Sequence, residues 1–331
     1  MLRLPQKPLA RSLLLAALIG VIYGIAAQFL ARTIRTPGPD DKDASSAFMV
    51  MSLAYVFVLP AVIGMVHVWV RSREGLISYG HAIAEPLLPA ILCLGVSMLI
   101  GWEGTICLIM AIPVMLPLAM AGGLAMRIML NFKNRNLVFA AFTIMPLPLA
   151  MAEQLVPLPQ EMQVVRNSVL IEAPAEVIWR KIVRVEKISE PQESPFFTMG
   201  FPKPIEAVLS GDGVGQTRLA TFERGLQFVE KVTEWKTNEK LAFSIEADPK
   251  ATPLTTLDEH VTVGGAFFDV LSGTYEIRRL NARESELILY SQHRISTHFN
   301  FYARLWSRYL MSEIQWNILQ VIKQRAEKEK A

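Results

Sequence analysis

Cysteine is nearly absent from this chain: its 331 residues include only Cys93 and Cys107, and both lie in apolar runs. Two thiols placed in this way provide neither a disulfide framework nor the ligand spacing of a zinc site. We therefore expect no metal site, and we predict that the protein uses no cofactor.

Acidic and basic residues are missing from five long stretches of the first half. These stretches are Ser12–Ala31, Ala44–Val70, Pro86–Trp102, Gly104–Met126 and Asn136–Ala152. A helix needs roughly 17–25 apolar residues to cross the hydrocarbon core of a bilayer. The sequence therefore predicts a membrane region over residues 1–156. Its five helices are expected at residues 12–31, 46–70, 86–102, 104–126 and 137–152.

The first and last of these stretches each have an alternative interpretation. The first follows Arg3, Lys7 and Arg11 as a signal peptide would, but its apolar core is longer than that of a typical signal and further spans follow. We interpret it as a retained helix. The last contains Pro146 and Pro148, which kink or break a helix. We predict a span there, with a re-entrant or interfacial segment as the alternative.

Basic residues between the stretches orient the bundle, because cytoplasmic loops carry an excess of Lys and Arg. With five spans and a cytoplasmic N-terminus, the inner segments hold Arg3, Lys7, Arg11, Arg71, Arg73, Arg127, Lys133 and Arg135, and the outer loops hold Arg32, Arg35 and Lys42. We therefore expect a cell (inner) membrane protein whose second half lies on the periplasmic or extracytoplasmic side. If residues 137–152 do not span, the second half is cytoplasmic.

Ionisable residues within membrane spans often mark ion or proton paths. His67 lies in the second stretch, close to Arg71, and we favour an interfacial histidine over a proton relay. Gly122 and Gly123 are interpreted as sites of close helix packing rather than as a gate. The bundle is therefore expected to act as an anchor.

The second half lacks a surplus of either charge: residues 160–331 carry 22 Lys+Arg and 23 Asp+Glu. They contain no basic stripe interleaved with aromatic residues, which argues against nucleic-acid binding. Their apolar residues alternate with period two, which predicts antiparallel strands, the first over Val164–Ile171. A helix is expected after Pro174, and a loop over Pro191–Gly215. A long helix over Thr297–Glu329 closes the chain, with an apolar stripe of Ala303, Trp306, Leu310, Ile314, Ile318 and Val321.

Three sequence motifs carry a resemblance to a known superfamily. They are Ser168-Val169-Leu170-Ile171-Glu172-Ala173-Pro174-Ala175-Glu176-Val177-Ile178-Trp179, then Val232-Thr233-Glu234-Trp235, and finally Ser291-Gln292-His293-Arg294-Ile295-Ser296-Thr297. With the order of strands and helices, residues 163–329 resemble the START-like, or SRPBCC, superfamily, in its polyketide cyclase/dehydrase branch. The resemblance implies an α+β helix-grip domain over residues 160–331, in which an antiparallel sheet wraps around the last helix. The N-terminal unit is expected to be an all-α transmembrane bundle.

Candidate ligand-binding residues follow from the faces of the expected strands and helix. They are Tyr275, Leu289, Ser291, His293, Ala303, Trp306 and Leu310. Trp306 beside the small Ala303 is expected to shape a cavity rather than to plug the core, with the core plug as the alternative.

Three residues are candidates for catalysis: His293, Glu230 and Tyr275. For His293 we favour a histidine bonded to backbone. Glu230 and Glu234 are expected to share a face, and we favour the convex, solvated one. Asp258-Glu259-His260 has the composition of a metal triplet, but consecutive strand residues point to opposite faces, so we interpret it as a polar turn.

The sequence supports two main hypotheses of function. The first is a membrane-anchored domain that binds a hydrophobic small molecule or lipid between the sheet and the last helix. The second is a cyclase or dehydratase that acts on an aromatic or polyketide-like substrate. Two or more polar groups converging in one buried place would favour the second. A sensory or structural partner of another membrane protein is a further alternative. The expected partners are therefore the lipid bilayer and an apolar ligand, with a membrane protein as the alternative partner.

Overall fold

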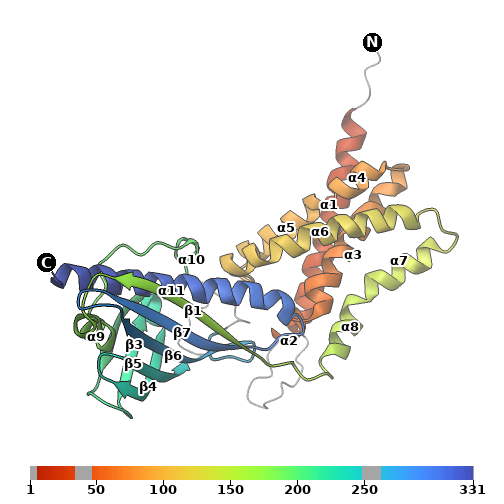
Figure 1. Ribbon diagram of the computed structural model, residues 1–331. Helices are drawn as coiled ribbons and strands as arrows, with labels where there is room; N and C mark the ends of the chain where they lie inside the picture. The colour runs from red at the N-terminus through yellow and green to blue at the C-terminus, as the bar shows by residue number, and fades with distance from the viewer. Residues whose placement is uncertain (1–5, 34–46, 248–261, 331) are drawn as a thin grey trace. The chain divides into compact units, whose positions relative to one another are not determined.

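The computed structural model describes residues 6–33, 47–247 and 262–330. The chain forms two compact units, Met1–Leu158 and Pro159–Ala331 (Figure 1). The Asp258-Glu259-His260 triplet lies outside the described residues.

In its described residues the first unit consists of helices joined by short connections. They are α1 (Gln6–Thr33), α2 (Ala47–Val50), the π-helix η1 (Ala54–Val58), α3 (Leu59–Arg71), the 3-10 helix η2 (Ser72–Glu74), α4 (Tyr79–Ala84), α5 (Leu87–Leu99), α6 (Thr105–Met129), α7 (Arg135–Ile144) and α8 (Pro146–Glu153).

Four helical stretches of the described chain are long and apolar enough to cross a membrane. They are Arg11–Thr33, Ala54–Glu74, Tyr79–Leu99 and Thr105–Met129. The residues of the fifth expected span form α7 and α8, which are bent by 41° at Met145, just before Pro146. Proline has no amide hydrogen and its ring clashes with the preceding turn, which accounts for the break. That this pair forms one span stays a prediction.

The sequence predicted that the third stretch begins at residue 86. In the structure it begins earlier, at Tyr79. Ser78 caps the new start, because its side chain accepts a hydrogen bond from the backbone N–H of His81. Glu85 is therefore part of the helical stretch. The charge-free run begins only at Pro86, so it is shorter than the helical stretch that contains it.

Glycines bring α3 and α6 into close contact. A Cβ atom added at Gly122 would lie 1.8 Å from the carbonyl oxygen of Ala61, and one at Gly64 would lie 2.0 Å from that of Ala119. Small residues allow helix backbones to approach in this way. This contact accords with the interpretation of Gly122 as a packing site.

The second unit combines strands and helices. They are β1 (Glu161–Ile171), α9 (Ala175–Val183), α10 (Pro195–Thr198), β2 (Pro204–Leu209), β3 (Thr217–Phe222), the 3-10 helix η3 (Glu223–Gly225), β4 (Gln227–Lys236), β5 (Lys240–Ala247), β6 (Phe268–Arg279), β7 (Ser285–Ile295) and α11 (Asn300–Lys330). Its described strands form one antiparallel sheet in the order β1-β7-β6-β5-β4-β3-β2.

The helix α11 lies along one face of the curled sheet, where it packs on β1, β7 and α9 (Figure 1). Apolar side chains with no exposed surface fill the space between sheet and helices. Five of them are Ile171, Ile178, Leu241, Leu287 and Leu319. The expected α+β helix-grip fold is thus confirmed for the second unit, in its strand order and in its long last helix.

The structure corrects the loop expected over Pro191–Gly215, because this segment contains α10 and the edge strand β2. Pro204 opens β2, and an edge strand tolerates a residue without an amide hydrogen. The apolar alternation over six residues is too short to stand out among the surrounding prolines and glycines.

The face that α11 turns toward the sheet also differs from the predicted stripe. Ser307, Met311 and Gln315 are buried, whereas Trp306 and Leu310 are only half-buried. The predicted face is therefore wrong by one position in the first half of the helix. Because the opposing strands present polar groups there, serine and glutamine occupy the buried positions, and hydrophobicity alone indicates the wrong face.

Candidate functional site

Two groups of polar side chains interrupt the apolar inner face of the sheet, the face that carries α9 and α11. In the first group, residues from β3, β4 and β6 converge. In the second, residues from β7 meet residues from α11. The members are Arg218, Glu230 and Tyr275 in the first group, and Ser291, His293, Ser307 and Gln315 in the second.

The first group contains a buried ion pair. Arg218 and Glu230 are register partners on β3 and β4, and their side chains form an ion pair at 3% and 6% residue exposure. The Tyr275 hydroxyl is hydrogen-bonded to Arg218, and the guanidinium carbon of Arg218 lies 5.3 Å from the centre of the Phe243 ring. The Nε atom of Arg218 has no hydrogen-bond partner among the described residues. The pair therefore contains one buried donor that is not satisfied within the described chain.

Burial changes the acid–base chemistry of this group. It raises the pKa of the Glu230 carboxyl above its ordinary value, while the positive charge of Arg218 opposes the rise. Burial also raises the pKa of Tyr275, opposed by Arg218 and reinforced by the Glu230 carboxylate. Tyr275 thus keeps its hydroxyl proton and its oxygen accepts from Arg218, and Glu230 is a carboxyl group that holds a proton more readily than one in water.

The structure corrects the prediction that Glu230 and Glu234 share a solvated face. The register of β4 against β5 shifts between Val232 and Glu234, so a bulge exchanges the two faces of the strand. Glu230 points inward with Val232, while Glu234 points outward and forms ion pairs with Lys236 and Lys240 at 2.9 and 2.6 Å. The exchange brings one carboxylate, rather than two, into the interior.

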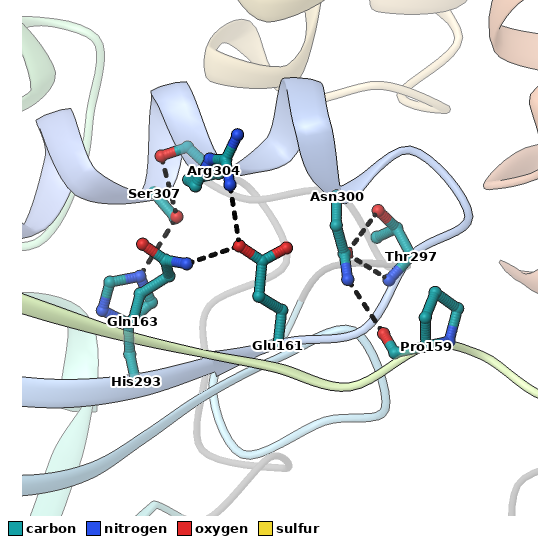
Figure 2. A network of polar contacts seen from close by, with 8 residues as sticks. All are labelled: Pro159, Glu161, Gln163, His293, Thr297, Asn300, Arg304 and Ser307. Carbon is teal, nitrogen blue, oxygen red and sulfur yellow. Dashed lines mark hydrogen bonds and ion pairs between the residues drawn. The ribbon is translucent and has the colours of Figure 1, made fainter.

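His293 belongs to the second group and has no exposed surface. Its Nε2 atom lies 3.1 Å from the hydroxyl oxygen of Ser307 on α11 (Figure 2). Its Nδ1 atom has no hydrogen-bond partner among the described residues, and its ring lies 5.6 Å from that of Phe268. The favoured interpretation, a histidine bonded to backbone, is therefore wrong, because the bond is made to a side chain.

Figure 2 shows how the start of α11 is fixed beside this histidine. Arg304 on α11 forms an ion pair of 3.1 Å with Glu161, which also accepts a hydrogen bond of 2.6 Å from Gln163. Asn300 donates a hydrogen bond of 2.9 Å to the carbonyl oxygen of Pro159. These contacts hold α11 against β1 at the level of His293.

Ser291 lies two residues before His293 on the same face of β7. It accepts a hydrogen bond of 2.7 Å from Gln315, which also donates one of 3.1 Å to the carbonyl oxygen of Val165. Asn167 donates a bond of 2.9 Å to the Gln315 side-chain oxygen. Ser291 is therefore engaged in a structural network between β1, β7 and α11.

The remaining predicted ligand-binding residues occupy different places. Leu289 is buried on β7, directly opposite Tyr275 in the register of β6 and β7. Ala303, Trp306 and Leu310 are half-buried on α11, beside its buried face. Whether these side chains contact a ligand stays a prediction.

The structure brings Glu230 and Tyr275 together but keeps His293 apart from them. The register partner of Tyr275 on β7 is Leu289, four residues from His293, which corresponds to about 13 Å along a strand. The three predicted catalytic candidates therefore do not form one constellation.

Sequence reasoning missed Arg218 and Gln315. A usable signal existed for Arg218, because it alternates with Ala220 and Phe222 and so shares their apolar face. A charged residue on the apolar face of a strand is unusual, so Arg218 could have been named as a candidate site residue from the sequence. Gln315 carried no such signal, since the predicted stripe of α11 excluded it.

The pKa of His293 is lowered to about 4, chiefly by burial and further by the positive charge of Arg308. Between about pH 4 and the ordinary histidine value of 6.5, the unfolded chain binds a proton at this position that the folded chain does not. This contribution to stability is thus complete above pH 6.5 and is lost as the pH falls to 4. Denaturant unfolding of a fragment of residues 159–331 measures this loss. Between pH 6.5 and pH 4, the free energy of unfolding of the wild-type fragment should fall by about 3 kcal/mol more than that of its His293→Gln variant.

The matched control is His298→Gln, at a histidine that is half-exposed. It should retain the pH dependence of the wild-type fragment. Parallel stability curves for His293→Gln and wild type would contradict the assignment.

Among the residues that the structure describes, no group of three His, Cys, Asp or Glu side chains could hold a metal ion.

Among comparisons with known proteins, the solved structures described below each cover about half of this chain. No family model matches the sequence, and no curated protein matches it. Among solved structures, an aromatase/cyclase from a Streptomyces species is 15% identical and covers 52% of this chain and 97% of its own, with a TM-score of 0.35. A norcoclaurine synthase from Thalictrum flavum is 10% identical over 52% of this chain and 99% of its own, with a TM-score of 0.33. A protein from Thermus thermophilus is 14% identical over 51% of this chain and 100% of its own, with a TM-score of 0.34.

Proposed function

We propose that this protein is anchored in a membrane by its first unit and binds a hydrophobic small molecule or lipid with its second. The four long apolar helical stretches support the anchor. The ligand would lie between the sheet and α11, with its polar group toward Arg218. An anchored domain of this kind is close to a source of apolar ligands.

The buried Arg218–Glu230 pair is the observation that carries the proposal. Taking two charges out of water costs several kcal/mol per ion, and apolar residues of similar volume often stabilise a fold as well or better. An unpartnered buried donor such as Arg218 Nε adds about 1–3 kcal/mol of cost. Stability of the fold therefore does not account for these residues, whereas recognition of a ligand does.

The surroundings of the pair indicate the chemistry of the ligand. Phe243, Val232 and Leu289 supply apolar surface on the same inner face of the sheet. Arg218 Nε is a donor, so it selects a ligand group that accepts a hydrogen bond, such as a carbonyl, ester or carboxylate oxygen. The expected ligand has an apolar body and one such group.

The test is to identify what copurifies with the full chain and to ask whether it depends on the pair. Mass spectrometry of the wild-type protein, extracted from membranes in detergent, should detect a bound apolar compound. In the variant R218M/E230M, which replaces both charges with apolar side chains, the amount bound should fall by at least tenfold. Circular dichroism and thermal unfolding would show that the variant is folded.

The matched control is R184M/D212M, which removes an exposed ion pair whose side chains are 60% and 70% exposed. It should retain the compound. Equal binding by R218M/E230M and R184M/D212M, or no bound compound in any of the proteins, would contradict the proposal. If R218M/E230M does not fold, Tyr275→Phe removes one hydroxyl from the same group and should lower binding in the same direction.

A cyclase or dehydratase is a second candidate, and the convergence of Arg218, Glu230 and Tyr275 favours it. A carboxyl with a raised pKa is suited to general acid–base catalysis, and Arg218 could stabilise a developing oxyanion. Incubation of the protein with its own extracted compound should then give either a cyclised isomer of the same mass or a product lighter by one water molecule. Glu230→Gln should abolish that change, and a compound unchanged in both mass and chromatographic retention with the wild-type protein would leave binding alone.

The side of the membrane on which the second unit lies is also a proposal. The distribution of basic residues favours the extracytoplasmic side if α7 and α8 together form a fifth span. A reporter fused after Ala331 should then be active only outside the cytoplasm. Activity confined to the cytoplasm would show that the second unit lies in the cytoplasm and would indicate that α7 and α8 do not cross the membrane.

A further inference from the structure

Three ionisable side chains meet inside the first unit, far in sequence from the ligand site. His67 and Arg71 lie one turn apart on α3, and Glu85 lies between α4 and α5. The Glu85 Oε2 atom is 3.5 Å from His67 Nε2 and 3.3 Å from Arg71 Nε. The three side chains are 0%, 8% and 11% exposed, respectively, so His67 is buried among the helices, while its depth in a membrane stays a prediction.

The helical framework around this cluster is broken at one point and closely packed at another. Glu85 and Pro86 separate α4 from α5 within a single apolar stretch. Beside this break, a Cβ atom added at Gly123 of α6 would lie 2.2 Å from the carbonyl oxygen of Ala82 and 2.5 Å from the Pro86 ring. Interrupted helices in membrane proteins commonly surround sites for ions or polar groups.

Polar atoms of the cluster are not fully used by hydrogen bonds. Both ring nitrogens of His67, Nε of Arg71 and Oε2 of Glu85 are buried and fall outside hydrogen-bond geometry with the described residues. Unsatisfied polar atoms in an apolar interior are expensive, and those found there usually meet ordered water. A water molecule can both accept from Arg71 and donate to Glu85 or His67.

The charges of the cluster are balanced before the histidine is considered. Arg71 and Glu85 carry opposite charges, so a neutral His67 leaves the cluster neutral, and a protonated His67 adds one positive charge beside Glu85. From α1, the backbone carbonyl of Ala16 faces His67. From α6, Arg127 donates to the carbonyl oxygen of Ile77 at 2.6 Å, and its guanidinium carbon lies 4.7 Å from the centre of the Tyr79 ring. Glu85 is therefore the group that stabilises an added proton, and Arg71 opposes it.

We propose that His67, Arg71 and Glu85 form a hydrated proton-binding site inside the helical unit. A hydronium ion entering from the side of the connection at residues 72–78 gives its proton to a ring nitrogen of His67 and remains as water. No covalent bond other than that to the proton is made or broken. In the proposed orientation this connection faces the cytoplasm, so the site responds to the pH there, independently of ligand binding in the second unit.

The experiment uses the full chain in lipid nanodiscs, with its histidines labelled with ¹⁵N. The chain has five histidines, and His67→Gln identifies the signal of His67. Between about pH 4 and pH 9, the His67 ring nitrogens should change reversibly from the neutral to the charged form, and they should show magnetisation transfer from water. Glu85→Gln should move the midpoint of this change by about one pH unit or more.

Matched controls come from two exposed residues nearby, Glu74 in the connection and His81 in α4. Glu74→Gln should leave the His67 midpoint unchanged, and His81→Gln should leave the His67 signal in place. A His67 signal that does not change over the whole range, or that shows no contact with water, would overturn the proposal. So would a midpoint that Glu85→Gln does not move. If Glu85→Gln does not fold, the pH series and the water contact in the wild-type protein still decide the question.

Discussion

Replacing Arg218 by methionine is expected to lower the free energy of unfolding of the second unit by about 3–5 kcal/mol. Glu230 is only 6% exposed, and Arg218 is its ion-pair partner. The substitution therefore leaves the buried Glu230 carboxylate without a positive partner. It also takes away the guanidinium group that is bonded to Tyr275. Denaturant unfolding of residues 159–331, followed by tryptophan fluorescence, measures the loss.

The double variant R218M/E230M is the informative control. It removes both charges, so the remaining cost is mainly that of repacking, and we expect it to be several kcal/mol more stable than Arg218→Met alone. Such a result would mean that the pair is not required for folding, as the proposed ligand role demands. Equal free energies of unfolding for the single and double variants would show that the loss of Arg218 does not leave Glu230 as a destabilising unpaired charge.

Gly122→Leu is expected to prevent correct assembly of the first unit. Its Cβ atom would lie 1.8 Å from the carbonyl oxygen and 2.5 Å from the carbonyl carbon of Ala61. Both atoms belong to the backbone, so no side-chain rotation relieves the clash and the two helices must separate. Overpacking typically costs 1–3 kcal/mol, and a backbone clash of this size is expected to cost about 3 kcal/mol or more. Thermal unfolding of the full chain in detergent, read as the loss of the monodisperse peak, would measure it.

Gly95→Leu is the matched control on α5. Gly95 is exposed, and a Cβ atom added there meets nothing within 4 Å. This variant should retain the thermal stability of the wild type. Comparable stability of Gly122→Leu and Gly95→Leu would contradict the close packing of α3 on α6.

Local patterns in the sequence were sufficient to identify most of the elements. The apolar stretches around Ile22 and Met115 identified two of the helical stretches, because a membrane core demands uninterrupted apolar length. The alternation along Leu287, Leu289 and Ser291 identified the inner face of β7, because strand side chains alternate strictly. Both signals depend only on neighbours in the chain, so they can be read without knowledge of the rest of the molecule.

The tertiary structure alone decided which charged and polar residues became buried. Glu230 was assigned to the wrong face because the exchange of faces in β4 arises from its pairing with β5, which no local pattern records. Glu85 meets His67 only because α4 and α5 return alongside α3. Gln315 is buried because Ser291 and Asn167 lie opposite it and satisfy its hydrogen bonds. A polar side chain can be buried where hydrogen-bond or ion-pair partners satisfy it, and here those partners lie far from it in the sequence.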